Sequence, residues 1–130
     1  MKPRVIAIDL DSTIWTEDFP NLGVPYPDAI ETINDMIKAG FEIVIWTSRD
    51  IENANKSIYH LIDEYGLNPN VKINVHSNIF LGIYDKRSVK IAADIYIDDK
   101  AYGAPKSFEH EWKNIRKRFG LWKKKNIFTL

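Results

Sequence analysis

Short apolar runs alternate with longer amphipathic segments along this chain. The runs cover residues 4–9, 41–46, 71–75 and 93–97, and they are rich in isoleucine, valine and aromatic side chains. Such runs are typical of strands buried on both faces of a parallel sheet, since a strand with one wet face alternates polar and apolar positions. The pattern predicts four strands of this kind, and residues 126–130 add a candidate edge strand.

Apolar residues at helical spacing mark the segments between these strands. Helices are predicted from residue 27 to about residue 39, over 50–65 and over about 107–119, and Gly40 and Gly66 end the first two. The remaining segments are predicted to be loops at 12–26 and 77–87 and a short helical turn at 88–92.

Strands that alternate with helices indicate right-handed crossovers between parallel strands. The expected fold is therefore α/β, a three-layer Rossmann-like parallel sheet with helices on both faces. At 130 residues the chain fits a single domain, residues 1–130, and no linker or internal repeat divides it. Its composition, 45% hydrophobic and 28% charged, is that of an ordinary globular protein.

Polar clusters follow three of the predicted strands. They are Asp9 to Thr13, Thr47 to Arg49 and the pair Asp98-Asp99. In open α/β sheets ligands bind at the carboxyl edge, where these clusters would meet. Because several carboxylates at one edge repel each other, a divalent cation is expected, and oxygen ligands favour Mg²⁺.

Each cluster also has a structural interpretation. Thr47 could cap the following helix, since Thr-x-x-acid patterns do so. The pair Asp98-Asp99 could begin a turn, and Arg49 could form a surface ion pair instead of reaching a leaving group. Lys90 could be an ordinary surface lysine, with Lys86 as its nearest competitor.

The same residues resemble four ordered motifs of the haloacid dehalogenase (HAD) superfamily. Asp9-Leu-Asp11-Ser-Thr13 after an apolar strand matches its DxDxT signature, and Thr47 after residues 43–46 resembles its second motif. Lys90 is similar to the third-motif lysine, and Tyr96-Ile-Asp98-Asp99 to the acidic fourth motif. The chain looks like a small capless subgroup, since the intervals between the motifs leave no room for a separate cap domain. Ser12 replaces a frequent glycine, and Gly103 stands where relatives often carry an acid.

The resemblance implies a role for each of these residues. Asp9 would be the nucleophile and form an aspartyl-phosphate, and Asp11 would be the general acid and base. Thr47, Ser48, Arg49 and Lys90 would bind substrate, and Thr47 and Lys90 would also assist catalysis. The metal ligands would be the Asp9 carboxylate, the Asp11 backbone carbonyl, the Asp98 carboxylate and, directly or through water, Asp99.

The expected function is therefore Mg²⁺-dependent hydrolysis of a small-molecule or polymer-borne phosphate monoester. Alternatives are a phosphotransferase, a nucleic-acid end phosphatase, and a non-catalytic phosphate-binding or receiver-like protein. The nucleic-acid alternative rests on charge alone, because 13 of the 18 lysines and arginines lie in residues 66–130. An oligomer remains open.

Two features bear on where the protein works. The chain contains no cysteine, so it has no disulfide and no thiolate ligand or nucleophile. No apolar run approaches membrane-spanning length, and the charged first nine residues do not resemble a signal peptide. We therefore expect a cytoplasmic protein with no membrane partner.

Overall fold

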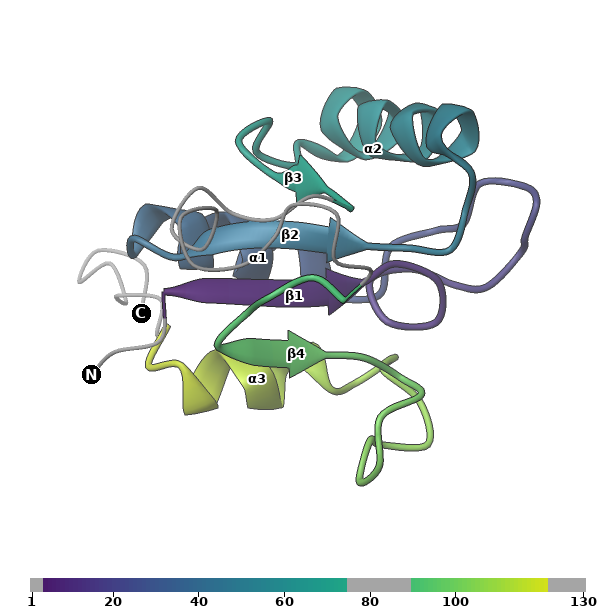
Figure 1. Ribbon diagram of the computed structural model, residues 1–130. Helices are drawn as coiled ribbons and strands as arrows, with labels where there is room; N and C mark the ends of the chain where they lie inside the picture. Colours follow the sequence, from purple (N-terminus) through teal and green to yellow (C-terminus); the bar gives the residue numbers. More distant parts are fainter. Residues whose placement is uncertain (1–3, 75–89, 122–130) are drawn as a thin grey trace, which may run out of the picture.

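The sheet has four parallel strands in the order β3-β2-β1-β4 (Figure 1). The computed structural model describes residues 4–74 and 90–121. The strands are β1 (Val5–Asp9), β2 (Glu42–Trp46), β3 (Lys72–Ile73) and β4 (Ile95–Ile97), and the helices are α1 (Ala29–Lys38), α2 (Ile51–Tyr65) and α3 (Trp112–Arg118). The predicted α/β class, the parallel sheet and the Rossmann-like arrangement are confirmed.

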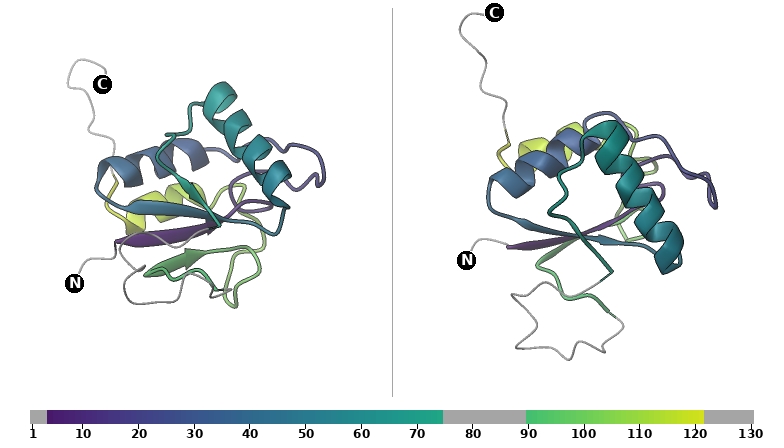
Figure 2. Two further views of the ribbon diagram at one scale, coloured as in Figure 1. Left: turned by 45° about the horizontal axis from the view of Figure 1, so that its top comes forward. Right: turned by 90° about the horizontal axis from the view of Figure 1, so that it is seen from above.

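The three described helices lie on the same side of the sheet (Figure 2). Ile6 and Ile8 of β1 share one buried cluster with residues from α1, α2 and α3. On the other side, Val5 and Val44 pack against Ile91. A second helical layer was expected there, but the connection from β3 to β4 lies mostly outside the described residues, and residues 90–92 of the predicted turn are not helical.

The sequence predicts the ends of α2 closely. The Asp50 carboxylate accepts a hydrogen bond from the Asn53 amide at 2.9 Å and so caps the first turn. Gly66 ends the helix in the left-handed conformation (φ 75°), which glycine adopts at little cost. Asp50 is therefore the N-cap of this helix, and the capping role considered for Thr47 is wrong.

The last helix and the third strand are shorter than their patterns predict. The expected helix 107–119 begins only at Trp112, because residues 108–111 form a separate turn closed by the Glu111 amide on the Phe108 carbonyl. The strand β3 stops at Asn74, whose positive φ of 50° is incompatible with a strand. The predicted loop 77–87 and edge strand 126–130 lie outside the described residues.

The β1–β4 pairing is anchored at the amino ends of these two strands. Asp94, just before β4, accepts hydrogen bonds from the backbone amides of Arg4 and Val5, both at 2.9 Å. The Asp94 amide donates in return to the Val5 carbonyl at 2.9 Å. These contacts lead into the register in which Ile8 lies beside Ile97. They also explain why β4 begins at Ile95 and not at residue 93, as the pattern predicts.

No helix among the described residues is long and apolar enough to cross a membrane. This finding agrees with the absence of a long apolar run in the sequence.

We expect Asp94→Ala to destabilise the protein at neutral pH by on the order of 1 kcal/mol, because two backbone amides lose a charged acceptor that is exposed and therefore screened. The Arg4 amide and then the Val5 amide hold the pKa of Asp94 below its ordinary value of 3.8. The stabilisation is thus complete above that value and is lost as the pH falls below it.

Urea unfolding of wild type and Asp94→Ala at pH 7 and pH 3 measures this effect. The difference between the two proteins should be larger at pH 7. Asp63→Ala, which removes an exposed carboxylate from α2, serves as the matched control. Equal stabilities of wild type and Asp94→Ala at pH 7 would contradict the anchoring role.

Candidate functional site

Carboxylates from β1 and β4 converge at the carboxyl edge of the sheet. Ile8 pairs with Ile97, so Asp9 at the end of β1 lies next to Asp98 in the parallel register. The side chains of Asp9, Asp98 and Asp99 each offer an oxygen within 4.8 Å of the others. All three are partly buried. This group could hold a metal ion, and its donors are all carboxylate oxygens, which suit a hard cation.

Thr13 connects the two acidic strand ends. Its side chain is fully buried, and its hydroxyl lies 3.2 Å from Asp9 Oδ2 and 3.3 Å from Asp99 Oδ1. A hydroxyl carries one hydrogen, so it donates to one of these carboxylates at a time. The same oxygen accepts a hydrogen bond from the Asp99 amide at 3.0 Å. Thr13 therefore holds the β1 and β4 ends together whichever carboxylate takes its hydrogen.

The proximity of the carboxylates has a clear electrostatic cost. Burial, then a hydrogen bond with Asp99 and the negative charges of Asp98 and Asp99, raise the pKa of Asp9 from 3.8 to about 8, against a smaller lowering by the Thr13 hydroxyl. Like charges at this spacing disfavour full ionisation. A bound cation would remove most of this repulsion.

The Asp11 side chain faces away from this carboxylate group. Its Oδ1 accepts from Trp15 Nε1 at 2.9 Å and from Arg49 Nη2 at 2.7 Å, and its Oδ2 accepts from Arg49 Nε at 2.9 Å. The Asp11 carboxylate is thus held by three N–H donors. Its side chain does not belong to the metal-binding group among the described residues, and a metal role for Asp11 rests on its backbone carbonyl alone.

Arg49 is buried, with 3% of its surface exposed. Besides Asp11, its guanidinium donates to the carbonyls of Pro20 and Asn21 and to the Asn53 side chain. Sequence reasoning left a surface ion pair and a substrate contact open. The structure shows an ion pair between the buried Arg49 and the partly buried Asp11.

Thr47 and Ser48 follow β2 at the same edge. Thr47 is buried, and its hydroxyl oxygen accepts a hydrogen bond from the Arg49 amide at 3.1 Å. The Asn74 side chain accepts from the Thr47 amide at 2.7 Å and donates to the Thr47 carbonyl at 2.8 Å. Ser48 is exposed. The hydroxyl hydrogen of Thr47 has no assigned acceptor among the described residues, so it can be donated to a bound anion.

Lys90, the lysine that the sequence motifs predict at the site, contacts an aromatic ring in the structure. Lys90 Nζ lies 5.2 Å from the centre of the Tyr96 ring, in a cation–π contact. The lysine that approaches the carboxylates is Lys100, whose Nζ is 3.7 Å from Asp99 Oδ2, with its side chain 89% exposed. The competitor Lys86 lies outside the described residues.

Sequence reasoning missed three contributors to the site. Asn74 holds Thr47, and buried Trp112 donates from Nε1 to the Thr13 carbonyl at 2.7 Å. The third is Tyr26, whose pKa is raised by burial and then by the charge of the Asp99 carboxylate. Asn74 lies inside the predicted strand 71–75, so its position gave no signal of a site residue; it follows the strand only in the structure.

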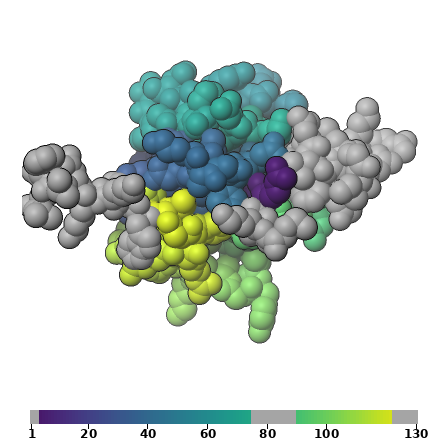
Figure 3. All heavy atoms as spheres, turned by 90° about the vertical axis from the view of Figure 1, so that its left-hand side faces the viewer, coloured from purple at the N-terminus to yellow at the C-terminus, as the bar shows by residue number. Residues whose placement is uncertain are grey.

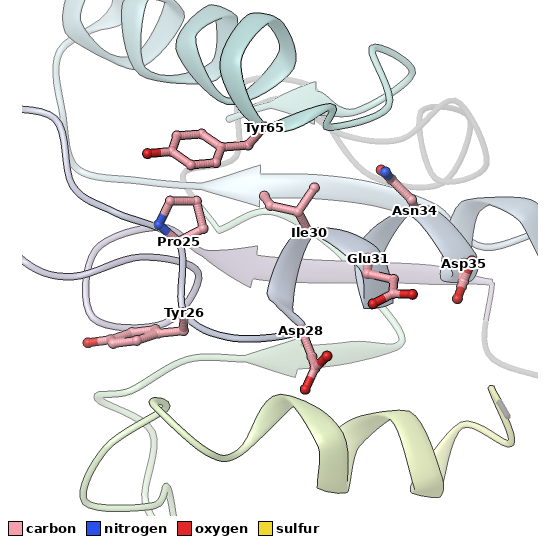
Figure 4. Close-up of a pocket in the computed structure, with 8 residues that line it drawn as sticks. All are labelled: Pro25, Tyr26, Asp28, Ile30, Glu31, Asn34, Asp35 and Tyr65. Atoms are coloured by element: carbon pink, nitrogen blue, oxygen red, sulfur yellow. The ribbon is translucent and has the colours of Figure 1, made fainter. Parts of the chain in front are cut away.

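Two cavities are relevant to the surroundings of the acidic group. A cavity of about 450 Å³ between α1 and α2 is lined by Pro25, Tyr26, Asp28, Ile30, Glu31, Asn34, Asp35 and Tyr65 (Figure 4). A second, of about 330 Å³, lies along β4 and includes Asp98. Of the three acidic residues, Asp98 lines this second cavity.

The fold and this group define an α/β protein with a candidate cation site at the carboxyl edge of its sheet. No protein-family model matches the chain, and no curated protein matches it. The chain is similar to a solved structure described as that of a conserved protein coded by a locus from Bacteroides thetaiotaomicron. The TM-score is 0.70 at 23% identity, over 95% of this chain and the whole of the other. At this identity the similarity shows the fold alone.

We expect Asp98→Asn to have opposite effects with and without a divalent cation. In EDTA the substitution relieves repulsion and keeps the oxygen that accepts from the Lys100 amide, so the variant should be at least as stable as wild type. With cation at about a hundred times its dissociation constant, wild type should gain about 2.7 kcal/mol, and the variant clearly less.

Thermal unfolding in EDTA and in millimolar Mg²⁺, Mn²⁺ or Ca²⁺ measures both effects. Asp63→Asn removes an exposed carboxylate from α2 and should behave as wild type in each condition. An equal cation-dependent gain in wild type and Asp98→Asn would show that Asp98 is not a ligand.

Thr13→Val tests the connection between the strand ends. Valine fills the same space but leaves the Asp99 amide without its acceptor, so we expect a loss of about 1–3 kcal/mol in urea unfolding. Thr13→Ser keeps the hydroxyl and should lose about 1 kcal/mol or less. A loss in Thr13→Ser with wild-type stability in Thr13→Val would show that packing, and not hydrogen bonding, is what Thr13 contributes.

Proposed function

We propose that this protein is a Mg²⁺-dependent phosphomonoester hydrolase that forms an aspartyl-phosphate on Asp9. The observation that carries the proposal is the meeting of the Asp9, Asp98 and Asp99 carboxylates within 4.8 Å at the carboxyl edge of the sheet. This arrangement agrees with the resemblance of the sequence motifs to the HAD superfamily.

The donor set fits a magnesium ion. It consists of carboxylate oxygens, and Mg²⁺ prefers hard oxygen ligands and few protein contacts, with water and substrate phosphate completing its shell. Asp9, Asp98 and Asp99 would hold the ion, together with the Asp11 backbone carbonyl. Bound there, Mg²⁺ supplies positive charge next to the transferring phosphoryl group.

The proposed reaction has two displacements at phosphorus. An Asp9 oxygen forms a bond to phosphorus as the bond to the leaving oxygen breaks, and that oxygen departs with the electron pair and takes up a proton. Water then attacks the phosphorus, the bond to Asp9 breaks, and inorganic phosphate is released. Splitting the hydrolysis in this way replaces one difficult step by two easier ones.

Asp11 and Thr47 support these displacements. Asp11 lies two residues beyond Asp9, and the N–H donors around it suit a carboxylate that accepts the proton of the attacking water. Its opposite role, donating a proton to the leaving oxygen, follows from microscopic reversibility. Thr47 has a hydroxyl hydrogen with which it can bind a phosphate oxygen.

These contacts change which basic side chains are assigned to the substrate. Lys90 would have to leave the Tyr96 ring to reach the phosphoryl group, whereas Lys100 already contacts Asp99. Arg49 is engaged with Asp11 and the loop, so substrate contacts are assigned to Thr47 and to the exposed Ser48 before Arg49. The role of Lys90 stays a prediction of the sequence motifs.

The proposed substrate is a phosphate monoester that is small or carried on a polymer. The basic end of α3 lies near the amino end of β2, whereas the acidic group lies at the carboxyl ends of the strands, so these basic residues do not favour nucleic acid at this site. The contact that places it there is between Phe119 and Phe41, whose rings meet edge to face at 5.6 Å. Figure 3, viewed from that side, shows the end of α3 on this face. Transfer of the phosphoryl group from Asp9 to an acceptor other than water is the alternative reaction of the same intermediate. The cytoplasmic location stays a prediction.

A non-catalytic phosphate-binding protein is the second candidate. The observation that favours it is the full engagement of the Asp11 carboxylate, which holds the expected acid away from the acidic group. Such a protein would bind Mg²⁺ and phosphate without turnover.

We expect p-nitrophenyl phosphate hydrolysis with Mg²⁺ that EDTA abolishes and that Asp9→Asn reduces to background, because the amide cannot act as nucleophile. Thr47→Val should lower the rate about tenfold, since it removes one donor to phosphate. Acid-quenched wild type should retain ³²P from labelled substrate, and Asp9→Asn should not.

Asp63→Asn, with the same chemical change on α2, should keep the wild-type rate. Phosphate release by Asp9→Asn at the wild-type rate would overturn the covalent mechanism. Magnesium binding with no release from a broad panel of phosphate monoesters would favour the second candidate.

A further inference from the structure

Arg49 is the most heavily bonded side chain near the site. Its side chain is 1% exposed, and its guanidinium donates through Nε and Nη2 to both oxygens of Asp11. This fork geometry is the strongest form of arginine–carboxylate pairing. The pair joins the segment after β2 to the segment after β1, across 38 positions of the sequence.

The other donors of Arg49 hold the segment between β1 and α1. Nη1 donates to the Pro20 carbonyl at 3.3 Å, and Nη2 to the Asn21 carbonyl at 2.9 Å. The guanidinium carbon lies 5.4 Å from the Trp15 ring centre and 5.2 Å from that of Phe19. A single cation therefore contacts four residues of this loop besides Asp11.

The same side chain is tied to α2. Nη1 donates to Asn53 Oδ1 at 2.7 Å, and Asn53 Nδ2 donates to the Pro20 carbonyl at 3.2 Å. The loop lies beyond the carboxyl ends of the strands, near the start of α2 (Figure 2). Arg49 thus fixes the loop against the first turn of a helix.

These contacts leave Arg49 no donor for a substrate. The Nε, Nη1 and Nη2 atoms all have acceptors within the protein. Releasing any of them would leave a buried charge or carbonyl without its partner, which is costly. A substrate contact would therefore have to be formed at the expense of the Asp11 pair.

We propose that Arg49 is a positioning residue that acts on the reaction through Asp11 and the loop over residues 15–21. It holds the Asp11 carboxylate beside the acidic group but outside it, so that the carboxylates that hold the cation are those of Asp9, Asp98 and Asp99. It also makes the loop a fixed wall of the site. This inference rests on the proposed function for its catalytic part and on geometry alone for its structural part.

Kinetics of Arg49→Met and Arg49→Lys test the catalytic part. We expect Arg49→Met to lower kcat by about a hundredfold, the cost of a misplaced catalytic group, with KM within about threefold. Arg49→Lys keeps the positive charge but cannot pair with both Asp11 oxygens in the same way, so its kcat should lie between those of wild type and Arg49→Met. The Mg²⁺ dissociation constant, measured by calorimetry, should stay within about twofold because Arg49 does not contact the Asp9, Asp98 and Asp99 carboxylates.

A double-variant cycle separates this role from a general loss of stability. If Arg49 acts through Asp11, the protein with Arg49→Met and Asp11→Asn should be no slower than Asp11→Asn alone. The double variant also avoids a buried unpaired carboxylate, so it remains informative if Arg49→Met folds poorly. Lys56→Met, which removes an exposed cation from α2, should leave kcat and KM at wild-type values.

Amide hydrogen exchange tests the structural part without any turnover. In Arg49→Lys and in the double variant the amides of Thr16, Asn21 and Val24, which are bonded within the loop, should exchange faster. Sheet amides such as that of Glu42 should be unchanged.

Three results would overturn the inference. They are a tenfold rise in KM with kcat kept, rate losses that multiply in the double variant, and loop amides that exchange as in wild type. If wild type binds Mg²⁺ but hydrolyses no phosphate monoester, the proposed function fails and the catalytic part of the inference fails with it. The exchange measurement still decides whether Arg49 anchors the loop.

Discussion

The parallel pairing of β1 with β4 is the constraint on which the candidate site depends. One register brings Asp9 beside Asp98, and the price of that register is the mutual repulsion of three partly buried carboxylates. Hydrogen bonds at both ends of the β1–β4 strand pair offset this repulsion. Asp94 binds the first amides of β1 at the amino end, and the Thr13 hydroxyl joins the strands at the carboxyl end.

Around this pair, buried polar groups hold each other in place. Trp112 donates to the Thr13 carbonyl, Asn74 pairs with both backbone groups of Thr47, and Arg49 satisfies Asp11 and two loop carbonyls. Because an unpaired buried polar group is costly, each partner restricts the position of the next. Such a network holds the side chains of the candidate site in fixed positions.

The fold was largely predictable, because its signals are local. Continuous apolar runs marked β1 and β2, and Gly66 marked the end of α2 in the left-handed conformation that glycine favours. The predictions lost accuracy where a residue distant in sequence changes the local outcome. The start of β4 moved because Asp94 turns to bind β1, and α3 begins late because residues 108–111 close into a separate turn.

The sequence by itself determined which residues stand at the carboxyl ends of the strands, because position along an element follows from its periodic pattern. It therefore placed Asp9, Thr47 and Asp98 at one edge of a parallel sheet. The tertiary structure decided which way each side chain faces and what it binds. Asp11 turns to Arg49 and Lys90 to Tyr96, since direction and partner depend on neighbours that only the folded chain brings together.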